Sequence, residues 1–180
     1  RHAGAFIEGH HQHGVPCMLK HFPGHGSAVD DSHLDLVDVT HTWSRVELEP
    51  YAELIDVGLA DAVMTAHVFN RDLDPHFPAT LSQGTIGGLL RGELGYDGVV
   101  ITDDVQMGAI AKHYGFEAAI ERTIAAGVDI VMLANNTLYQ EDAVPRAHHC
   151  IRELVENGRI SEERIDESCA RIARLKEISA

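Results

Sequence analysis

The stretch V-P-C-M-L-K-H-F-P-G-H-G-S-A-V-D-D-S-H, residues 15–33, joins a short apolar run to a loop rich in titratable side chains. The apolar residues 15–19 read as a buried strand. Pro23, Gly24 and Gly26 follow, and they cannot continue a regular element, so the strand breaks into a loop there. A loop of this composition at the end of a strand is where α/β proteins place their chemistry.

The same pattern of an apolar run followed by an amphipathic segment occurs four times along the chain. Strands are expected at residues 15–20, 62–68, 99–102 and 130–133. Helices are expected at residues 1–13, 45–58, 85–94, 116–126, 141–157 and 161–178. Alternation without hairpin signals predicts an α/β fold with a parallel sheet. Four units make either a small doubly wound sheet or one half of a TIM-type (β/α)8 barrel, which typically needs about 250 residues.

Composition limits the classes of function. With 180 residues the chain is expected to form a single domain, residues 1–180. A formal net charge of −14 argues against nucleic acid or an anionic membrane as partner. No apolar run approaches the roughly 20 residues that span a bilayer. Three cysteines without paired spacing, and no visible signal peptide, favour a reducing compartment, so a cytoplasmic location is expected.

Each predicted strand ends in polar side chains that are able to do chemistry. They are Lys20 and His21, then His67, then Asp103 and Asp104, and finally Asn135 and Asn136. In a barrel, the carboxyl ends of different strands meet on one face, where catalytic groups gather. Polar residues can also simply mark where a strand reaches solvent. Four such ends in a row favour a functional site.

Asp103 is the best candidate for a nucleophile or a base. It directly follows the apolar run V-V-I-T, so a rigid strand would hold its carboxylate at the mouth of the sheet. Asp104 should point the other way, and we expect it to act as the N-cap of the following segment.

Asp31 and His33 form a second candidate pair. A carboxylate two residues from a histidine can accept its ring N–H and raise the imidazole pKa, which makes a proton donor suited to neutral pH. On spacing alone, two solvated loop residues are the favoured explanation, because D-x-H is a common tripeptide.

Metal and nucleotide sites are not expected. The chain has 13 histidines, but no H-E-x-x-H or Cys/His ligand spacing is present. G-H-G in the first loop lacks the third glycine and the helix start of a dinucleotide fingerprint. We therefore expect no cofactor.

The motifs K-H-F-P-G-H-G, D-S-H, A-H-V and I-T-D-D-V-Q-M together resemble those of glycoside hydrolase family 3. More narrowly, they resemble its bacterial β-N-acetylglucosaminidase branch, which acts in peptidoglycan recycling. The resemblance covers nearly the whole chain in order. It implies that Asp103 is the nucleophile and that His33, partnered by Asp31, is the acid/base.

The resemblance also assigns a sugar-binding role to the lysine–histidine pair, Lys20 and His21, and His67 is counted with them. It implies a retaining mechanism in which terminal β-linked N-acetylglucosamine leaves a muropeptide. A neutral imidazole base does not repel an anionic acceptor, so phosphorolysis is an alternative to hydrolysis.

The resemblance extends only to the second half of the family's barrel. A half-barrel exposes a sheet edge and apolar strand faces, so a homodimer that completes the barrel is expected. A half-barrel with only a sugar-binding or structural role, and a metal-dependent hydrolase of another class, remain as alternatives.

Overall fold

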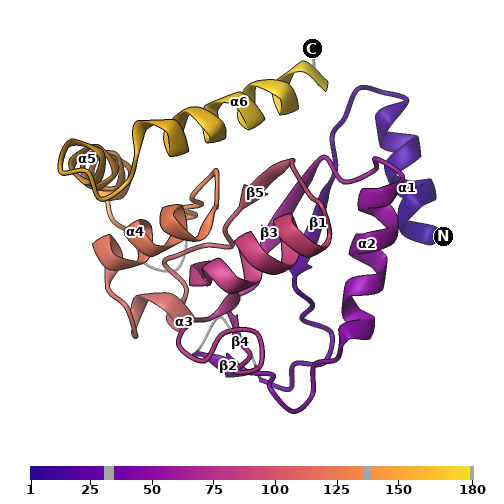
Figure 1. Cartoon of the computed structure of the whole chain (residues 1–180), viewed down its shortest axis with the longest axis horizontal. Helices are drawn as coiled ribbons and strands as arrows, with labels where there is room; N and C mark the ends of the chain where they lie inside the picture. Colours follow the sequence, from indigo (N-terminus) through magenta and orange to yellow (C-terminus); the bar gives the residue numbers. More distant parts are fainter. Residues whose placement is uncertain (31–34, 136–138, 179–180) are drawn as a thin grey trace.

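The computed structural model describes residues 1–30, 35–135 and 139–178. Its central sheet holds three parallel strands in the order β1 (Met18–Phe22), β3 (Ala62–Thr65) and β5 (Val99–Ile101). A parallel bridge between Ile101 and Ile130 adds a fourth position beside β5. The predicted parallel α/β architecture is confirmed, and the described strands do not close into a barrel (Figure 1).

Helices follow each strand, as the alternation predicted. Figure 1 shows α1 and α2 at one end of the sheet, α5 at the other, and α6 running above it. The helical segments are α1 (His2–His11), η1 (Arg45–Leu48), α2 (Glu49–Asp56), η2 (Ala79–Leu81), the π-helical η3 (Gly84–Glu93), α3 (Gly108–Ala111), α4 (Phe116–Ala126), α5 (Ala143–Glu156) and α6 (Glu162–Ile178). No helix in the described part of the chain is long and apolar enough to cross a bilayer.

The core lies between the sheet and the helices that cover one of its faces. Phe22, Val63 and Val100 from the strands pack with Ile86 and Leu90 from η3, and all five are fully buried. Continuous apolar runs suit strands that are covered rather than alternately exposed, which is why β3 and β5 read as unbroken hydrophobic segments.

Three predicted strands differ from the structure. The buried strand expected at residues 15–20 is instead β1, Met18–Phe22, which lies at the edge of the sheet and alternates between exposed and partly buried side chains up to the buried Phe22. The segment 62–68 divides into β3 and a separate β4 (Val68–Phe69), which pairs in parallel with β2 (Val37–Asp38). Ala66 and His67 lie between them. The Ala66 amide still donates to the Phe22 carbonyl of β1, whereas the Ala66 carbonyl and the His67 ring contact the Thr80 hydroxyl. The predicted strand 130–133 forms only the single bridge at Ile130, because Thr102 offers its hydroxyl oxygen to the Met132 amide in place of a ladder.

A buried carboxylate lies at the amino-terminal end of the sheet. The side chain of Asp129 has no exposed surface, and both of its oxygens accept hydrogen bonds. Oδ2 accepts from the Arg91 guanidinium at 2.8 Å and the Val100 amide at 2.9 Å. Oδ1 accepts from the Ser168 hydroxyl at 2.7 Å. Arg171 and Arg164 lie 3.4 and 3.5 Å from Oδ1.

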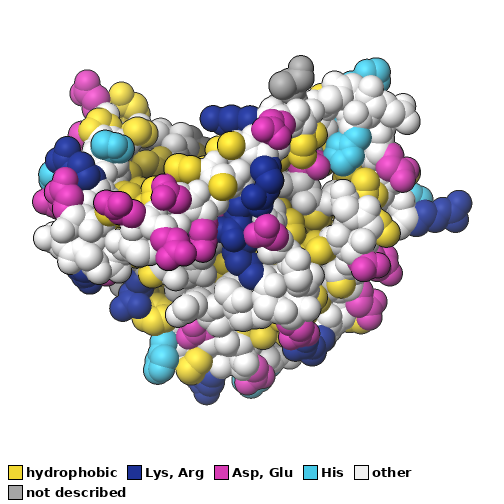
Figure 2. All heavy atoms as spheres, turned by 45° about the horizontal axis from the view of Figure 1, so that its top comes forward, with side chains coloured by type: hydrophobic (Ala, Val, Ile, Leu, Met, Phe, Trp, Pro, Cys, Tyr) yellow, Lys and Arg dark blue, Asp and Glu magenta, His cyan; other side chains and the backbone are white. Residues whose placement is uncertain are grey.

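These contacts tie α6 and η3 to the sheet. Arg171 and Arg174 of α6 also pair with the exposed carboxylate of Asp97. Figure 2 looks onto the α6 side, where basic side chains gather in a strip with acidic side chains beside them.

Candidate active site

Asp103 lies immediately after β5, at the carboxyl end of the sheet. Thr102 holds this end in place, because its amide donates to the Ile130 carbonyl at 3.0 Å. The side chain of His21, at the carboxyl end of β1, approaches from two strands away. Its Nε2 lies 3.7 Å from Oδ2 of Asp103. The structure thus brings together two of the residues singled out from the sequence.

The Asp103 carboxylate has two differently placed oxygens. Oδ1 accepts a hydrogen bond from the Asp104 amide at 2.8 Å, which orients the group. Oδ2 is the atom that faces His21. The side chain is 20% exposed, so a ligand can reach it. A carboxylate held by its own backbone and open on one side has the geometry of a nucleophile or a base.

Asp104 does not cap a helix, and that prediction is wrong. The next helix, α3, begins at Gly108 with Met107 at its N-cap position. Oδ1 of Asp104 instead accepts from the amides of Gln106 and Ala134, at 3.1 and 3.2 Å. Residues 104–107 form a turn, which closes because the Asp104 carbonyl accepts from the Met107 amide at 3.0 Å.

His67 is fully buried behind this turn. Its Nε2 lies 2.9 Å from the Asp104 carbonyl oxygen, and its Nδ1 lies 2.8 Å from the Thr80 hydroxyl. Burial lowers the pKa of the imidazole, although the nearby carboxylates of Asp103 and Asp104 oppose that effect. Both ring nitrogens have protein partners, so the ring faces the Asp103 turn and not an open pocket.

The loop that follows β1 is braced by one carboxylate. Glu47 in η1 accepts hydrogen bonds from the Gly26 amide, at 3.1 Å, and from the Ser27 hydroxyl. Gly24 has a φ of +128°, and a Cβ built there would lie 2.6 Å from Cβ of Glu47. From the sequence alone, Glu47 reads as an ordinary helix carboxylate that faces solvent.

The predicted acid/base pair, Asp31 and His33, lies outside the described residues. Asp35, two residues further on, is described. His113 follows α3 and donates from Nε2 to the Asp35 carboxylate at 2.6 Å. That hydrogen bond lowers the pKa of the Asp35 carboxyl. The segment after the loop is therefore attached to the element that follows Asp103.

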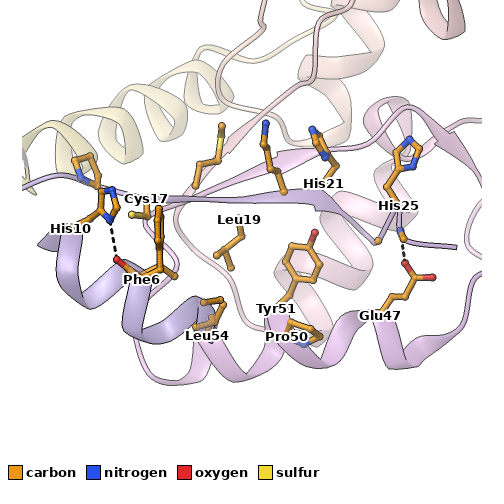
Figure 3. Close-up of a pocket in the computed structure, with 17 residues that line it drawn as sticks. Phe6, His10, Cys17, Leu19, His21, His25, Glu47, Pro50, Tyr51 and Leu54 are labelled. Atoms are coloured by element: carbon orange, nitrogen blue, oxygen red, sulfur yellow. Dashed lines mark hydrogen bonds between the residues drawn. The ribbon is translucent and has the colours of Figure 1, made fainter. Parts of the chain in front are cut away.

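A cavity of about 730 Å³ lies along the free edge of β1. Figure 3 shows α1 and α2 lining its apolar part, with Phe6 and Leu54 facing β1. Lys20 and His21 line its polar end, so the predicted sugar-binding pair borders this cavity. Asp103 is not among its lining residues. In the described parts of the chain, no group of three or more His, Cys, Asp or Glu side chains could hold a metal ion.

Known proteins resemble this chain in sequence. A β-hexosaminidase from Tolumonas auensis is 39% identical over 137 residues, which is 74% of this chain and 41% of the relative. A β-hexosaminidase A from Pseudoalteromonas piscicida is 35% identical over 180 residues, 91% of this chain and 30% of the relative. The chain thus spans less than half the length of these relatives.

A solved structure is also similar. A glycoside hydrolase family 3 β-N-acetylglucosaminidase from a Paenibacillus species shares 44% identity with a TM-score of 0.89. The match covers 96% of this chain and 33% of that one. The family model described as the glycosyl hydrolase family 3 N terminal domain matches residues 1–175. The chain therefore belongs to glycoside hydrolase family 3.

Proposed function

We propose that this chain carries the catalytic residues of a retaining glycosidase that removes terminal β-linked N-acetylglucosamine from muropeptides derived from peptidoglycan. Membership of family 3 and the names of the relatives support the reaction class. The placement of Asp103 at the carboxyl end of β5, with Oδ2 facing His21, is the single observation that carries the proposal.

The mechanism uses two displacements. Oδ2 of Asp103 attacks the anomeric carbon while protonated His33, partnered by Asp31, gives its proton to the leaving oxygen. Neutral His33 then takes a proton from water, and the water oxygen displaces Asp103. The hydrogen bond between His113 and Asp35 supports this assignment. It attaches Asp35, two residues after His33 in the sequence, to the segment that follows α3.

Lys20 and His21 provide the sugar contacts in this proposal. They are the third and fourth of the five residues of β1, and both line one cavity. Their ammonium and imidazole N–H groups are donors for the hydroxyls and the amide carbonyl of N-acetylglucosamine. His67 serves the same site through its contact with the Asp104 carbonyl, next to Asp103.

The test is an assay of the purified chain with a chromogenic β-N-acetylglucosaminide. We expect turnover, with the β-anomer of the free sugar appearing first by NMR, and a loss of about 1,000-fold or more in Asp103→Asn. Asp97→Asn is the matched control, because Asp97 is an exposed aspartate at the other end of β5. Equal turnover in Asp103→Asn and wild type would overturn the proposal.

Phosphorolysis is the variant of this reaction that a histidine base permits, because a neutral imidazole does not repel phosphate as a carboxylate would. The same assay in high phosphate distinguishes the two. A sugar 1-phosphate product means phosphorolysis, and free sugar alone means hydrolysis.

A second candidate is a half-barrel that binds sugar without turning it over. The open edge of β1 favours it, because Met18 is 37% exposed there and Phe6 of α1 is 64% exposed. In either case we propose that two copies associate through this edge, and sedimentation should show a dimer. Sugar binding without turnover would support the second candidate, and a stable monomer would exclude the association.

We also propose that the enzyme works in the reducing cytoplasm, where muropeptides are recycled. All three cysteines are free thiols in the structure. Retention of full activity in strong reductant is the expected result.

A further inference from the structure

We propose that His67 is a positioning residue for Asp103: a neutral His67 donates Nε2–H to the Asp104 carbonyl and is itself held by a hydroxyl chain from Thr65 through Thr80. This inference rests on the proposed function for its catalytic meaning. Its structural part can be tested without any turnover.

The direction of each hydrogen bond around His67 follows from what its partners can donate or accept. A carbonyl oxygen only accepts, so the 2.9 Å contact between Nε2 of His67 and the Asp104 carbonyl requires a proton on Nε2. In a neutral ring, Nδ1 then accepts, and the Thr80 hydroxyl at 2.8 Å must donate to it. The Thr65 hydroxyl, 2.9 Å from Thr80, supplies the hydrogen bond that the Thr80 oxygen accepts.

The alternative is an imidazolium with protons on both nitrogens. Nδ1–H would then donate to Thr80, and the Thr80 hydroxyl would turn to the Ala66 carbonyl, which also lies at 2.8 Å. His67, Thr65 and Thr80 are all fully buried, and burial disfavours the charged ring. The groups that act electrostatically on the ring are the carboxylates of Asp103 and Asp104, which favour the charge, and His21, which opposes it.

Asp104 connects His67 to Asp103. Three groups of Asp104 are held: its amide donates to Oδ1 of Asp103, its carbonyl accepts from His67 and from the Met107 amide, and its carboxylate accepts from Gln106 and Ala134. The amide is the group that orients the Asp103 carboxylate. The carbonyl lies in the Asp104–Val105 peptide and the amide in the preceding peptide, and both are joined through the backbone of Asp104. Loss of the His67 bond leaves the carbonyl with the Met107 amide alone, and we expect the resulting shift in the Asp104 backbone torsions to move the amide that aims Asp103.

The chain offers a matched pair of substitutions. In His67→Gln the side-chain amide nitrogen reaches the position of Nε2 and can still donate to the Asp104 carbonyl. In His67→Asn the amide nitrogen reaches only the position of Nδ1, so that bond is lost. Thr80→Ser keeps the hydroxyl and Thr80→Val removes it. His149→Gln, on the exposed face of α5, is the control for histidine loss.

The kinetic arm compares kcat and KM for the chromogenic β-N-acetylglucosaminide. We expect His67→Asn to lower kcat by about 10- to 100-fold with KM changed less than about twofold, because a misplaced reacting group affects the chemical step. His67→Gln should recover most of that loss. Equal losses in the two variants, or a raised KM with unchanged kcat, would overturn the inference. The second result would mean that His67 contacts the sugar.

The second arm needs no activity. NMR of the ¹⁵N-labelled chain reads which ring nitrogen carries the proton, and the signal absent from His67→Gln identifies the residue. We expect a proton on Nε2 alone at pH 7.5. A proton on Nδ1 would overturn the proposed chain of hydrogen bonds from Thr65 through Thr80 to His67. If the wild-type chain shows no turnover, the proposed function fails while this measurement still decides the role of His67 as donor.

Discussion

Asp129→Asn removes the one charge that faces three guanidinium groups inside the protein. Both carboxylate oxygens are in use, Oδ2 by Arg91 and Val100 and Oδ1 by Ser168 and two further arginines. The new amide nitrogen is a donor. In either orientation it therefore faces groups that are themselves donors, so at least one set of hydrogen bonds is lost.

The magnitude follows from the burial. The Asp129 side chain is fully buried, and its arginine partners are between 13% and 18% exposed. Removing one partner of a buried ion pair lowers the free energy of unfolding by about 3–5 kcal/mol. A domain is stable by only about 5–15 kcal/mol, so this is a large share of the total.

Urea unfolding followed by circular dichroism measures the loss. With an m value of about 2 kcal/mol/M, a loss of 4 kcal/mol moves the midpoint down by about 2 M. Asp97→Asn is the control, because Asp97 is 73% exposed and pairs with arginines of the same helix. Its exposed ion pairs should contribute less than about 1 kcal/mol. A midpoint for Asp129→Asn equal to that of Asp97→Asn would refute the reasoning.

Three further outcomes follow from the site. His113→Ala, which removes the hydrogen bond to Asp35, should lower kcat by about tenfold if residue 35 anchors the acid/base loop, and unchanged kcat would count against that role. Burial lowers the pKa of His67, so below its unfolded pKa of about 6.5 the unfolded state binds one more proton than the folded state. The contribution of neutral His67 to the free energy of unfolding is therefore complete above pH 6.5. On acidification below that pH, the free energy of unfolding of the wild type falls by up to about 1.4 kcal/mol per pH unit, and it should fall less steeply in His67→Gln. Gly24→Ala places a Cβ 2.6 Å from Cβ of Glu47 at a φ of +128°, and thermal unfolding should report a loss of about 2 kcal/mol, with a neutral effect contradicting the close approach.

The sequence predicts the helices and the parallel order well, because those depend on local periodicity and on apolar runs. Residues 116–126 were predicted as a helix, and α4 has the same bounds. Its end is local chemistry, since Gly127 adopts the left-handed conformation there, with a φ of +109°. Asp103 could be placed because a rigid strand directly precedes it.

The remaining features depend on contacts between distant segments. His67 looks like a polar strand end, and only the fold shows that Thr80 and Asp104 occupy both of its nitrogens. The Asp104 carboxylate accepts from the Ala134 amide, 30 residues further along the chain, which no local pattern encodes. Glu47 likewise braces a loop about 20 residues before it.

The most direct test of the central claim is identification of the residue that becomes glycosylated. The chain is incubated with a slow fluorinated substrate of the N-acetylglucosaminide type, digested, and read by mass spectrometry. We predict one sugar on the peptide that contains Asp103 and none in Asp103→Asn. A sugar on any other carboxylate, or unchanged turnover without Asp103, would contradict it.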